Sequence, residues 1–239
     1  MGVTERLDKI LSSQNFGSRK DTAKLIRTGR VSVNGQRVTR PEAKADPGQD
    51  SITLDGKEIG YERRVYYMMN KPGGVLSAAR DKHSKTVLDL LPPEYQRRGL
   101  FPAGRLDKDT QGLLLITDDG DFAHRMLSPK SGVRKIYHAR LDAPIGAEDI
   151  RAFEQGVQLE DFQCLPAGLR VLHEGSEPLV EVTVCEGKFH QVKRMFAARG
   201  KQVTFLKRVQ IGGLVLEETL ALGETRKLTP QELERIFHP

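Results

Sequence analysis

The sequence predicts an α+β protein with a small N-terminal module and a larger mixed domain on a mainly antiparallel sheet. Three observations lead to this fold class. The excess positive charge is confined to the first 44 residues, residues 5–59 combine helical periodicity with short hairpins, and later strands and helices alternate without regular βαβ units. We place the boundary just before residue 65, which gives domains of residues 1–60 and 65–239.

The composition is that of a globular protein, with 38% hydrophobic and 29% charged residues in a chain of 239. No apolar run approaches the roughly 18 residues of a membrane span, and the N-terminus lacks the apolar core of an export signal. Cys164 and Cys185 lie in apolar segments, which predicts buried reduced thiols rather than a disulfide or a metal pair. We therefore expect a cytoplasmic protein without a membrane segment.

The net charge of +6 is distributed unevenly. Residues 1–44 hold ten Lys and Arg against four Asp and Glu, whereas the rest of the chain balances at 28 against 28. A basic excess at one end of a chain indicates a module that binds a polyanion.

Residues 5–59 predict a compact unit of two helices and two hairpins. Leu7, Ile10 and Leu11 recur at helical spacing in a first helix over 5–13, and a second helix follows. Ser18 and Asp21 form a capping box at its start, and Gly29 ends it. The segments VSVNGQRV and SITLDGKEI then predict hairpins with Asn-Gly and Asp-Gly turns.

The basic residues of this module fit a nucleic-acid surface. The stretch between residues 17 and 40 has seven basic residues and one acidic residue, more than a solvated helix face requires. The segments Arg6-Leu7-Asp8-Lys9, Gly17-Ser18-Arg19 and Gly29-Arg30-Val31 with Val33-Asn34-Gly35 resemble the RNA-binding module of ribosomal small-subunit protein four, the αL motif. The expected phosphate contacts are Arg6, Arg19, Lys20, Lys24, Arg27 and Arg30.

The second domain begins with a strand in VYYMMNKPGG, which ends in a Pro-Gly-Gly turn. Short helices are predicted in TVLDLL before Pro92, in FAHRML after a turn, in AEDIRAFEQ before Gly156, and after the cap Thr229-Pro230. LLLI and LVEVTV read as strands, as does much of KQVTFLKRVQIGGLVL, while KFHQVKRMFAARG predicts a basic amphipathic helix.

Asp107 is the carboxylate whose position calls for an explanation. It precedes the apolar run Leu113–Ile116, and Arg105 lies two residues away, on the same side of an extended chain. A buried structural Arg–Asp pair is the simpler interpretation. The alternative is a partner from the basic helix, where we expect Phe189, Val192 and Phe196 to face the core and His190, Lys193 and Arg194 to share a neighbouring side.

Several other site classes lack their motifs. The chain has no phosphate loop, no dinucleotide-binding turn and no CxxC or HExxH spacing. Asp107 and Asp109 could hold Mg²⁺ as a pair, but no third acid stands beside them in the sequence. We expect no metal and no cofactor.

Four motifs in order identify a resemblance that covers essentially the whole chain. They are Asn70-Lys71-Pro72-Gly73, Gly104-Arg105-Leu106-Asp107 with Thr110 and Gly112, Lys135-Ile136-Tyr137, and the segment from Glu186-Gly187-Lys188 to Met195. Together they resemble the bacterial ribosomal RNA pseudouridine synthases of the small-subunit (RsuA-like) family. The resemblance implies isomerisation of a uridine in ribosomal RNA without a cofactor.

The resemblance also implies roles. Asp107 matches the catalytic aspartate, Tyr137 the tyrosine that packs on the target base, and Lys193 the basic partner of the aspartate, with Arg194 the alternative. Arg105 matches the arginine that fills the gap left by a flipped nucleotide. Lys71 is expected either to contact phosphate or to support its surroundings, and His190 and Arg194 are further candidates for substrate binding.

The segment from His190 to Phe196 resembles small-subunit more than large-subunit enzymes. We expect a monomer that acts on small-subunit ribosomal RNA or an assembly intermediate. A large-subunit synthase, a non-catalytic RNA-binding assembly factor and a metal-dependent nuclease or transferase remain alternatives.

Overall fold

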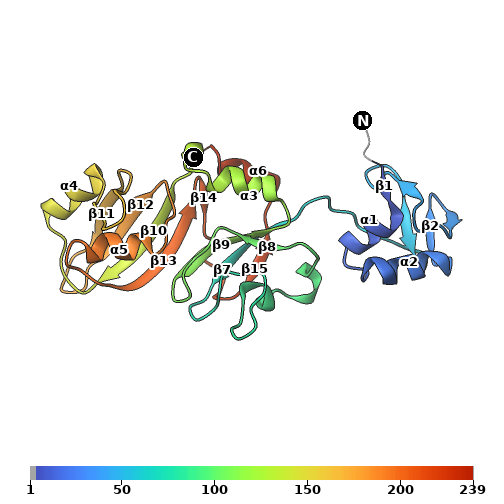
Figure 1. The fold of residues 1–239 in the computed structure, drawn as a ribbon, viewed down its shortest axis with the longest axis horizontal. Coiled ribbons are helices and arrows are strands. Elements are labelled where there is room, and N and C mark those ends of the chain that lie inside the picture. Colours follow the sequence, from blue (N-terminus) through green and yellow to red (C-terminus); the bar gives the residue numbers. More distant parts are fainter. Residues whose placement is uncertain (1–3, 239) are drawn as a thin grey trace. The chain divides into compact units, whose positions relative to one another are not determined.

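The computed structural model describes residues 4–238 and divides the chain into two compact units (Figure 1). The first extends to Val65 and also includes the segment Pro93–Leu100. The second comprises Tyr66–Pro92 and the chain from Phe101 onward. The grouping of Pro93–Leu100 with the N-terminal unit was not expected from the sequence.

The N-terminal unit has two helices and two small sheets. A two-stranded ribbon pairs β1 with β4, and a four-stranded antiparallel sheet has the order β3-β2-β5-β6. The elements are β1 (Glu5–Arg6), α1 (Leu7–Ser13), α2 (Arg19–Arg27), β2 (Val31–Val33), β3 (Gln36–Val38), β4 (Lys44–Ala45), β5 (Ile52–Leu54), β6 (Lys57–Glu58) and the 3₁₀ turn η2 (Pro93–Tyr95).

Local sequence signals account for most of this unit. Ser18 and Asp21 form the expected capping box at the start of α2. Asn34 and Gly35 both have positive φ, as a type I′ hairpin turn requires. The first helix is shorter than expected because Glu5 pairs with β4 as a strand, so that α1 begins only at Leu7. Its apolar face is fully buried in the core of the unit.

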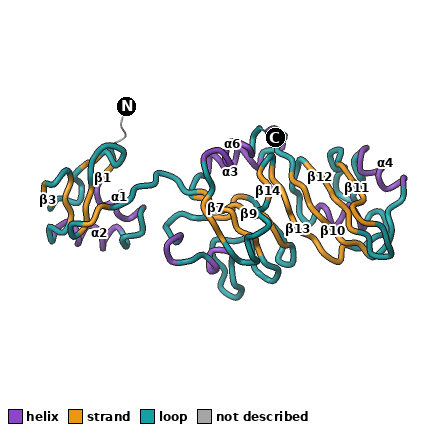
Figure 2. The backbone as a smooth tube through the Cα atoms, turned by 180° about the vertical axis from the view of Figure 1, so that it is seen from behind, coloured by secondary structure: helices purple, strands orange, loops and turns teal. Residues whose placement is uncertain are grey.

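The second unit is built on one nine-stranded sheet with the path β11-β12-β10-β13-β9-β7-β15, to which β8 and β14 add at β9 and β13 (Figure 2). All strand pairs are antiparallel except β13 with β9, so the expected mainly antiparallel sheet is confirmed. The strands are β7 (Tyr66–Lys71), β8 (Phe101–Ala103), β9 (Gln111–Thr117), β10 (Lys135–Leu141), β11 (Gly168–His173), β12 (Leu179–Val184), β13 (Val203–Ile211), β14 (Leu214–Val215) and β15 (Thr225–Lys227).

Helices cover the two halves of this sheet separately. In Figures 1 and 2, α3 and α6 lie together beside β14, and their apolar side chains join strand residues such as Met68 and Leu115 in one core. Near β11 and β13, Phe153 of α4 and Phe196 of α5 are fully buried with ring centroids 4.9 Å apart. The helical elements are η1 (Val87–Leu90), α3 (Gly120–Leu127), η3 (Pro129–Ser131), α4 (Ala147–Gln155), α5 (Gln191–Ala197) and α6 (Pro230–Arg235).

Helix boundaries in this unit follow the predicted caps with two exceptions. Asp119 caps α3, Gly156 follows α4, and the box of Thr229 and Glu232 begins α6. The segment before Pro92 forms only a single 3₁₀ turn, η1. The basic helix is also shorter than expected, because α5 begins at Gln191 rather than near Lys188. Cys164 is buried, whereas Cys185 is only partly buried, and both are free thiols.

Candidate active site

Asp107 lies in the loop of residues 104–110 that connects β8 to β9. The buried side chains of Ser77 and Lys71 form hydrogen bonds to the backbone of this loop. The hydroxyl of Ser77 donates to the carbonyl of Leu106 at 2.8 Å and accepts from the Leu106 N–H at 3.1 Å. Lys71 at the end of β7 donates through Nζ to the carbonyls of Asp107 and Thr110 at 3.1 and 2.9 Å. The backbone of the loop is therefore fixed on both sides of the carboxylate.

Of the two roles that the sequence left open for Lys71, the surroundings of its ammonium favour support of the loop over contact with phosphate. The residue is fully buried, and its ammonium also donates to the carbonyls of Pro72 and Lys108. Burial lowers the pKa of Lys71 to about 8. Four backbone carbonyl oxygens accept hydrogen bonds from the ammonium, which ties Lys71 to the loop that carries Asp107.

A glycine places this loop beside β13. Gly112 has φ +101°, and a Cβ at this position would lie 2.2 Å from the carbonyl oxygen of Arg208. Any other residue would therefore push apart the parallel pairing of β9 with β13. Gly112 therefore brings the Asp107 loop and Arg208 of β13 into one site.

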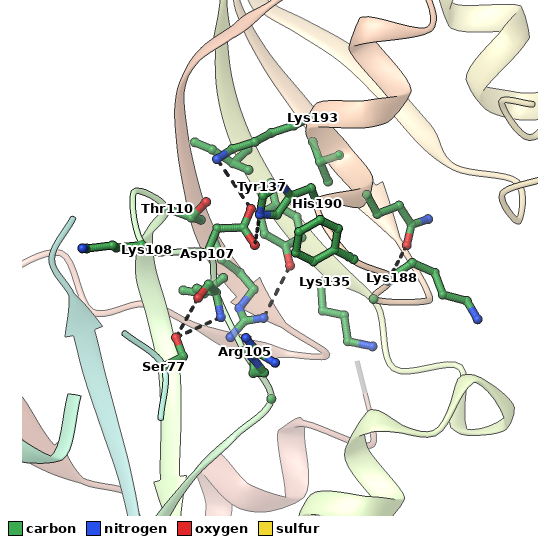
Figure 3. A pocket seen from close by; sticks show the side chains of 18 of the residues that line it. Ser77, Arg105, Asp107, Lys108, Thr110, Lys135, Tyr137, Lys188, His190 and Lys193 are labelled. Carbon is green, nitrogen blue, oxygen red and sulfur yellow. Dashed lines mark hydrogen bonds and ion pairs between the residues drawn. The ribbon is translucent and has the colours of Figure 1, made fainter. Parts of the chain in front are cut away.

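Asp107 meets the N-terminal end of α5, as the sequence led us to expect (Figure 3). Nζ of Lys193 lies 3.5 Å from Oδ2 of Asp107, and Nε2 of His190 lies 3.6 Å from Oδ1. The same ammonium lies 2.5 Å from Oδ1 of Asp109, and this hydrogen bond is the main cause that lowers the pKa of Asp109. Lys193 thus bridges two carboxylates, of which Asp109 is the more exposed.

Arg194, the alternative partner of Asp107 and an expected substrate ligand, lies elsewhere. Its guanidinium forms an ion pair with Asp161 and lies 5.4 Å from the ring centroid of Phe162. It is not among the residues that line the pocket around Asp107. One helical step of about 100° separates the two basic side chains, so only Lys193 faces the carboxylate.

The prediction that Phe189, Val192 and Phe196 would all face the core was wrong for Phe189, and the turn before α5 gives the reason. The side chain of Gln191 accepts from the Lys188 N–H at 2.9 Å and donates to Glu186 at 2.8 Å, while His190 adopts left-handed backbone angles with φ +49°. This geometry excludes Phe189 from the helix. Its side chain is 74% exposed instead of buried, whereas Val192 and Phe196 face the core as expected.

Tyr137 enters the same pocket from β10, and two buried cations that the sequence reasoning missed lie beside it. Arg208 is the cross-strand partner of Tyr137, donates through Nε to the carbonyl of Leu113 at 2.8 Å, and approaches the Tyr137 hydroxyl at 3.4 Å. Its Nη2 is buried without a hydrogen-bond partner among the described residues. Lys135 donates to the carbonyl of Cys185, and burial lowers its pKa. Only the pairing of β10 with β13, absent from the sequence prediction, brings Arg208 here.

These side chains line one pocket of about 860 Å³. Arg105 and Asp107 come from the β8–β9 loop, His190 and Lys193 from the start of α5, and Tyr137 and Lys135 from β10 (Figure 3). Arg208 of β13 lines the same pocket. Arg105 is exposed, so its guanidinium is accessible to a ligand. The pocket therefore joins a carboxylate paired with a cation, a tyrosine, and a buried donor without a partner.

The six basic residues expected to bind RNA in the N-terminal unit fall into two groups. Arg6 and Arg19 both bond to the buried carboxylate of Asp8 and lower its pKa, and Arg30 is paired with Asp55. Lys20, Lys24 and Arg27 are exposed within an arc of α2 and form no ion pair with any described residue. The second group is free to contact phosphates, whereas the first also has a structural role.

Two further observations concern residues 4–238. No group of three or more His, Cys, Asp or Glu side chains is arranged to hold a metal ion in this part of the chain. Within the same range, no helix combines the length and the apolar character needed to cross a bilayer.

Comparison with known proteins agrees with this geometry. The sequence is 43% identical over 236 residues to the uncharacterized RNA pseudouridine synthase YtzG of Bacillus subtilis, covering 98% of this chain and 99% of that protein. It is 42% identical to ribosomal small subunit pseudouridine synthase A of Vibrio cholerae (97% and 99% covered) and 39% identical to ribosomal large subunit pseudouridine synthase B of Bacillus subtilis (97% and 95%).

A solved structure and two family profiles give the same result. A crystal structure of a pseudouridylate synthase, 36% identical, superposes with a TM-score of 0.67 and covers 97% of this chain and 99% of that one. Residues 5–51 match the S4 domain, and residues 65–198 match the RNA pseudouridylate synthase family. The chain therefore belongs to the RNA pseudouridylate synthase family and carries an N-terminal S4 domain.

Proposed function

We propose that this protein isomerises one uridine of ribosomal RNA to pseudouridine, with Asp107 as the catalytic carboxylate. The observation that carries the proposal is the fixed position of Asp107 in the pocket, 3.5 Å from the ammonium of Lys193 and on a loop held by Lys71 and Ser77. The contact with Lys193 and the hydrogen-bonded loop hold the carboxylate in one place, as a nucleophile or base requires.

The isomerisation requires no external reactant. The bond between N1 of uracil and C1′ of ribose breaks, the base turns, and a bond between C5 and C1′ forms. C5 loses one proton and N1 gains one, so atoms and electrons balance within the nucleotide. A carboxylate can serve either as the nucleophile at the sugar or as the base that removes the proton from C5, and Asp107 is suited to both tasks.

Tyr137 and Arg208 support this assignment from the sheet side of the pocket. An extruded uracil needs an apolar surface for its ring and donors for its carbonyl oxygens. The Tyr137 ring offers the first, and the guanidinium of Arg208, which lines the same pocket, is suited to the second. We assign Tyr137 to base packing and Arg208 to holding the extruded base, a role that its position in the sequence does not suggest.

Arg105 and the S4 domain supply the contacts to the rest of the RNA. An exposed guanidinium at the pocket, on the loop that carries Asp107, is suited to occupy the space that a flipped nucleotide leaves in the RNA. On α2, Lys20, Lys24 and Arg27 are suited to bind phosphates without reading sequence. His190 stays close to Asp107 and is assigned to the same substrate pocket.

The substrate that we favour is small-subunit ribosomal RNA, acted on in the cytoplasm by a monomer. The segment His190–Phe196 supports this choice, as does the 42% identity to a small-subunit enzyme. A large-subunit target is the second candidate, because a large-subunit enzyme is 39% identical over nearly the whole chain.

The proposal is tested by mapping pseudouridine in both ribosomal RNAs from cells with and without the gene. One position in small-subunit RNA should lose its modification without the gene and regain it with the wild-type protein but not with Asp107→Asn. Loss of a large-subunit position would assign the second substrate. Unchanged maps, or restoration by Asp107→Asn, would reject catalysis of ribosomal RNA modification through Asp107 and favour a binding role.

A further inference from the structure

Phe189 exposes an aromatic ring at the substrate pocket. With 74% of its surface accessible, it is the most exposed large apolar side chain among the described residues. The imidazole of His190 stacks on the ring with a centroid distance of 3.8 Å and an angle of 16° between planes. A ring stacked on one face and so strongly exposed leaves its other face open to solvent.

The outward position of Phe189 is fixed by its surroundings. Gln191 accepts from the Lys188 N–H and is itself held by the buried Glu186. Together with the left-handed backbone of His190, these bonds define the turn that carries the ring. The core does not need Phe189, because Val192 and Phe196 fill it. A water-facing phenyl group on an ordered turn is a surface suited to a ligand with an apolar face.

The charges around Phe189 indicate the kind of ligand. Lys188, Lys193 and Arg105 line the same pocket, and the imidazole of His190 connects the ring to Asp107 through the 3.6 Å contact (Figure 3). An aromatic face among cations is the combination by which proteins bind unpaired nucleotides, with the base on the ring and the phosphates on the cations. Extrusion of a uridine also deprives the neighbouring bases of a stacking partner.

We propose that Phe189, backed by His190, is the platform on which an unpaired base adjacent to the target uridine stacks. The inference rests on the proposed function, in which the target uridine itself lies at Asp107 and Tyr137. The platform holds the flanking nucleotide and thereby selects RNA in which that nucleotide is unpaired.

The first test compares substitutions at Phe189. The probe is an RNA stem-loop around the uridine identified by mapping, and the readout is kcat/KM together with the Kd of the RNA. Phe189→Ala and Phe189→Leu should lower kcat/KM by roughly 5- to 100-fold, mainly through weaker binding, because an aliphatic side chain does not stack. Phe189→Tyr should stay near wild type. Phe205→Ala is the control, since Phe205 is partly exposed on β13 and lies outside the pocket.

The decisive test removes the base instead of the ring. Stem-loops with an abasic nucleotide on the 5′ or the 3′ side of the target are assayed with wild type and Phe189→Leu. On one of these RNAs the kcat/KM of the wild type should fall by about the factor that Phe189→Leu causes on intact RNA. On that same RNA, Phe189→Leu should cause no further loss. If Phe189→Leu lowers kcat/KM by the same factor on both abasic RNAs and on intact RNA, the stacking proposal is overturned. It is also overturned if the substitution lowers kcat/KM only on ribosomal particles.

The reference in both tests is product formation by the wild-type enzyme on intact RNA. Absence of pseudouridine there would reject the proposed function and the platform with it. If the wild type forms pseudouridine normally and the kcat/KM of Phe189→Leu lies within twofold of the wild-type value, the platform alone is rejected.

Discussion

Lys193 on α5 lies 3.5 Å through Nζ from Oδ2 of Asp107, and the same ammonium contacts Asp109 at 2.5 Å. One ammonium thus contacts both carboxylates. Asp107 lies in the pocket, whereas Asp109 is more exposed to solvent.

Replacement of Lys193 by Met should lower the single-turnover rate by about tenfold to a hundredfold, the effect of losing a charge-assisted contact to the reacting group. Arg194→Met should stay within about threefold of wild type, because its partner is Asp161. Rapid-quench measurement of pseudouridine formation distinguishes the two variants. Equal losses would show that the pairing with Asp107 has no special part in catalysis.

Lys71→Met should lower the free energy of unfolding by about 2–4 kcal/mol, because it leaves buried carbonyl groups without their donor. Urea denaturation measures this change. The salt dependence of RNA binding should remain that of wild type, since the ammonium does not reach the surface. Lys108→Met, at an exposed position of the same loop, is the stability control. A reduced salt slope in Lys71→Met would restore the phosphate-contact interpretation.

Joint replacement of Lys20, Lys24 and Arg27 by Gln should reduce the slope of log affinity against log salt by about 2–3, nearly one per lost phosphate contact. Substitution is preferable to deletion of the module, because Pro93–Leu100 also belongs to the N-terminal unit. The matched control replaces three exposed cations of the second unit outside the pocket, Lys130, Arg151 and Arg235. Equal slopes for the two triple variants would mean that α2 faces solvent in the complex.

Glu232 should make the second unit sensitive to acid. Its bonds to Arg226 lower the pKa of Glu232 to about 2, below the ordinary value of 4.5. A lowered carboxylate pKa stabilises the fold fully above pH 4.5, and this contribution disappears as the pH falls to about 2. The difference in unfolding free energy between wild type and Glu232→Gln should therefore shrink by about 2–3 kcal/mol across that window. A constant difference in urea titrations would contradict this linkage.

Features set by neighbouring residues in the chain were predictable. The capping box of Ser18 and Asp21 and the turn at Asn34 and Gly35 depend on a few consecutive residues, and both form as expected. The encounter of Asp107 with the basic helix was also expected, because the motif resemblance linked the two segments and a charge at a strand end needs a partner.

Features set by distant pairings were not predictable. Arg208 reaches Tyr137 only through the bulged register of β10 with β13, for which the sequence contains no local sign. Lys71 is buried because loop carbonyls from another segment surround it. Phe189 fits the apolar periodicity of the expected helix, but the Gln191 side chain accepts a hydrogen bond from the Lys188 N–H, and the helix begins three residues later, at Gln191.

Single-turnover conversion by Asp107→Asn tests whether Asp107 performs the isomerisation. The assay uses the mapped stem-loop with saturating enzyme, and Asp109→Asn is the matched control on the same loop. Asp107→Asn should form no measurable pseudouridine while its Kd for the RNA stays within a few-fold of wild type, because Asn keeps the shape but is neither nucleophile nor base. Asp109→Asn should retain activity within about tenfold, the size of one exposed ionic contact. Pseudouridine formation by Asp107→Asn at a rate near that of wild type would show that Asp107 is not the catalytic carboxylate.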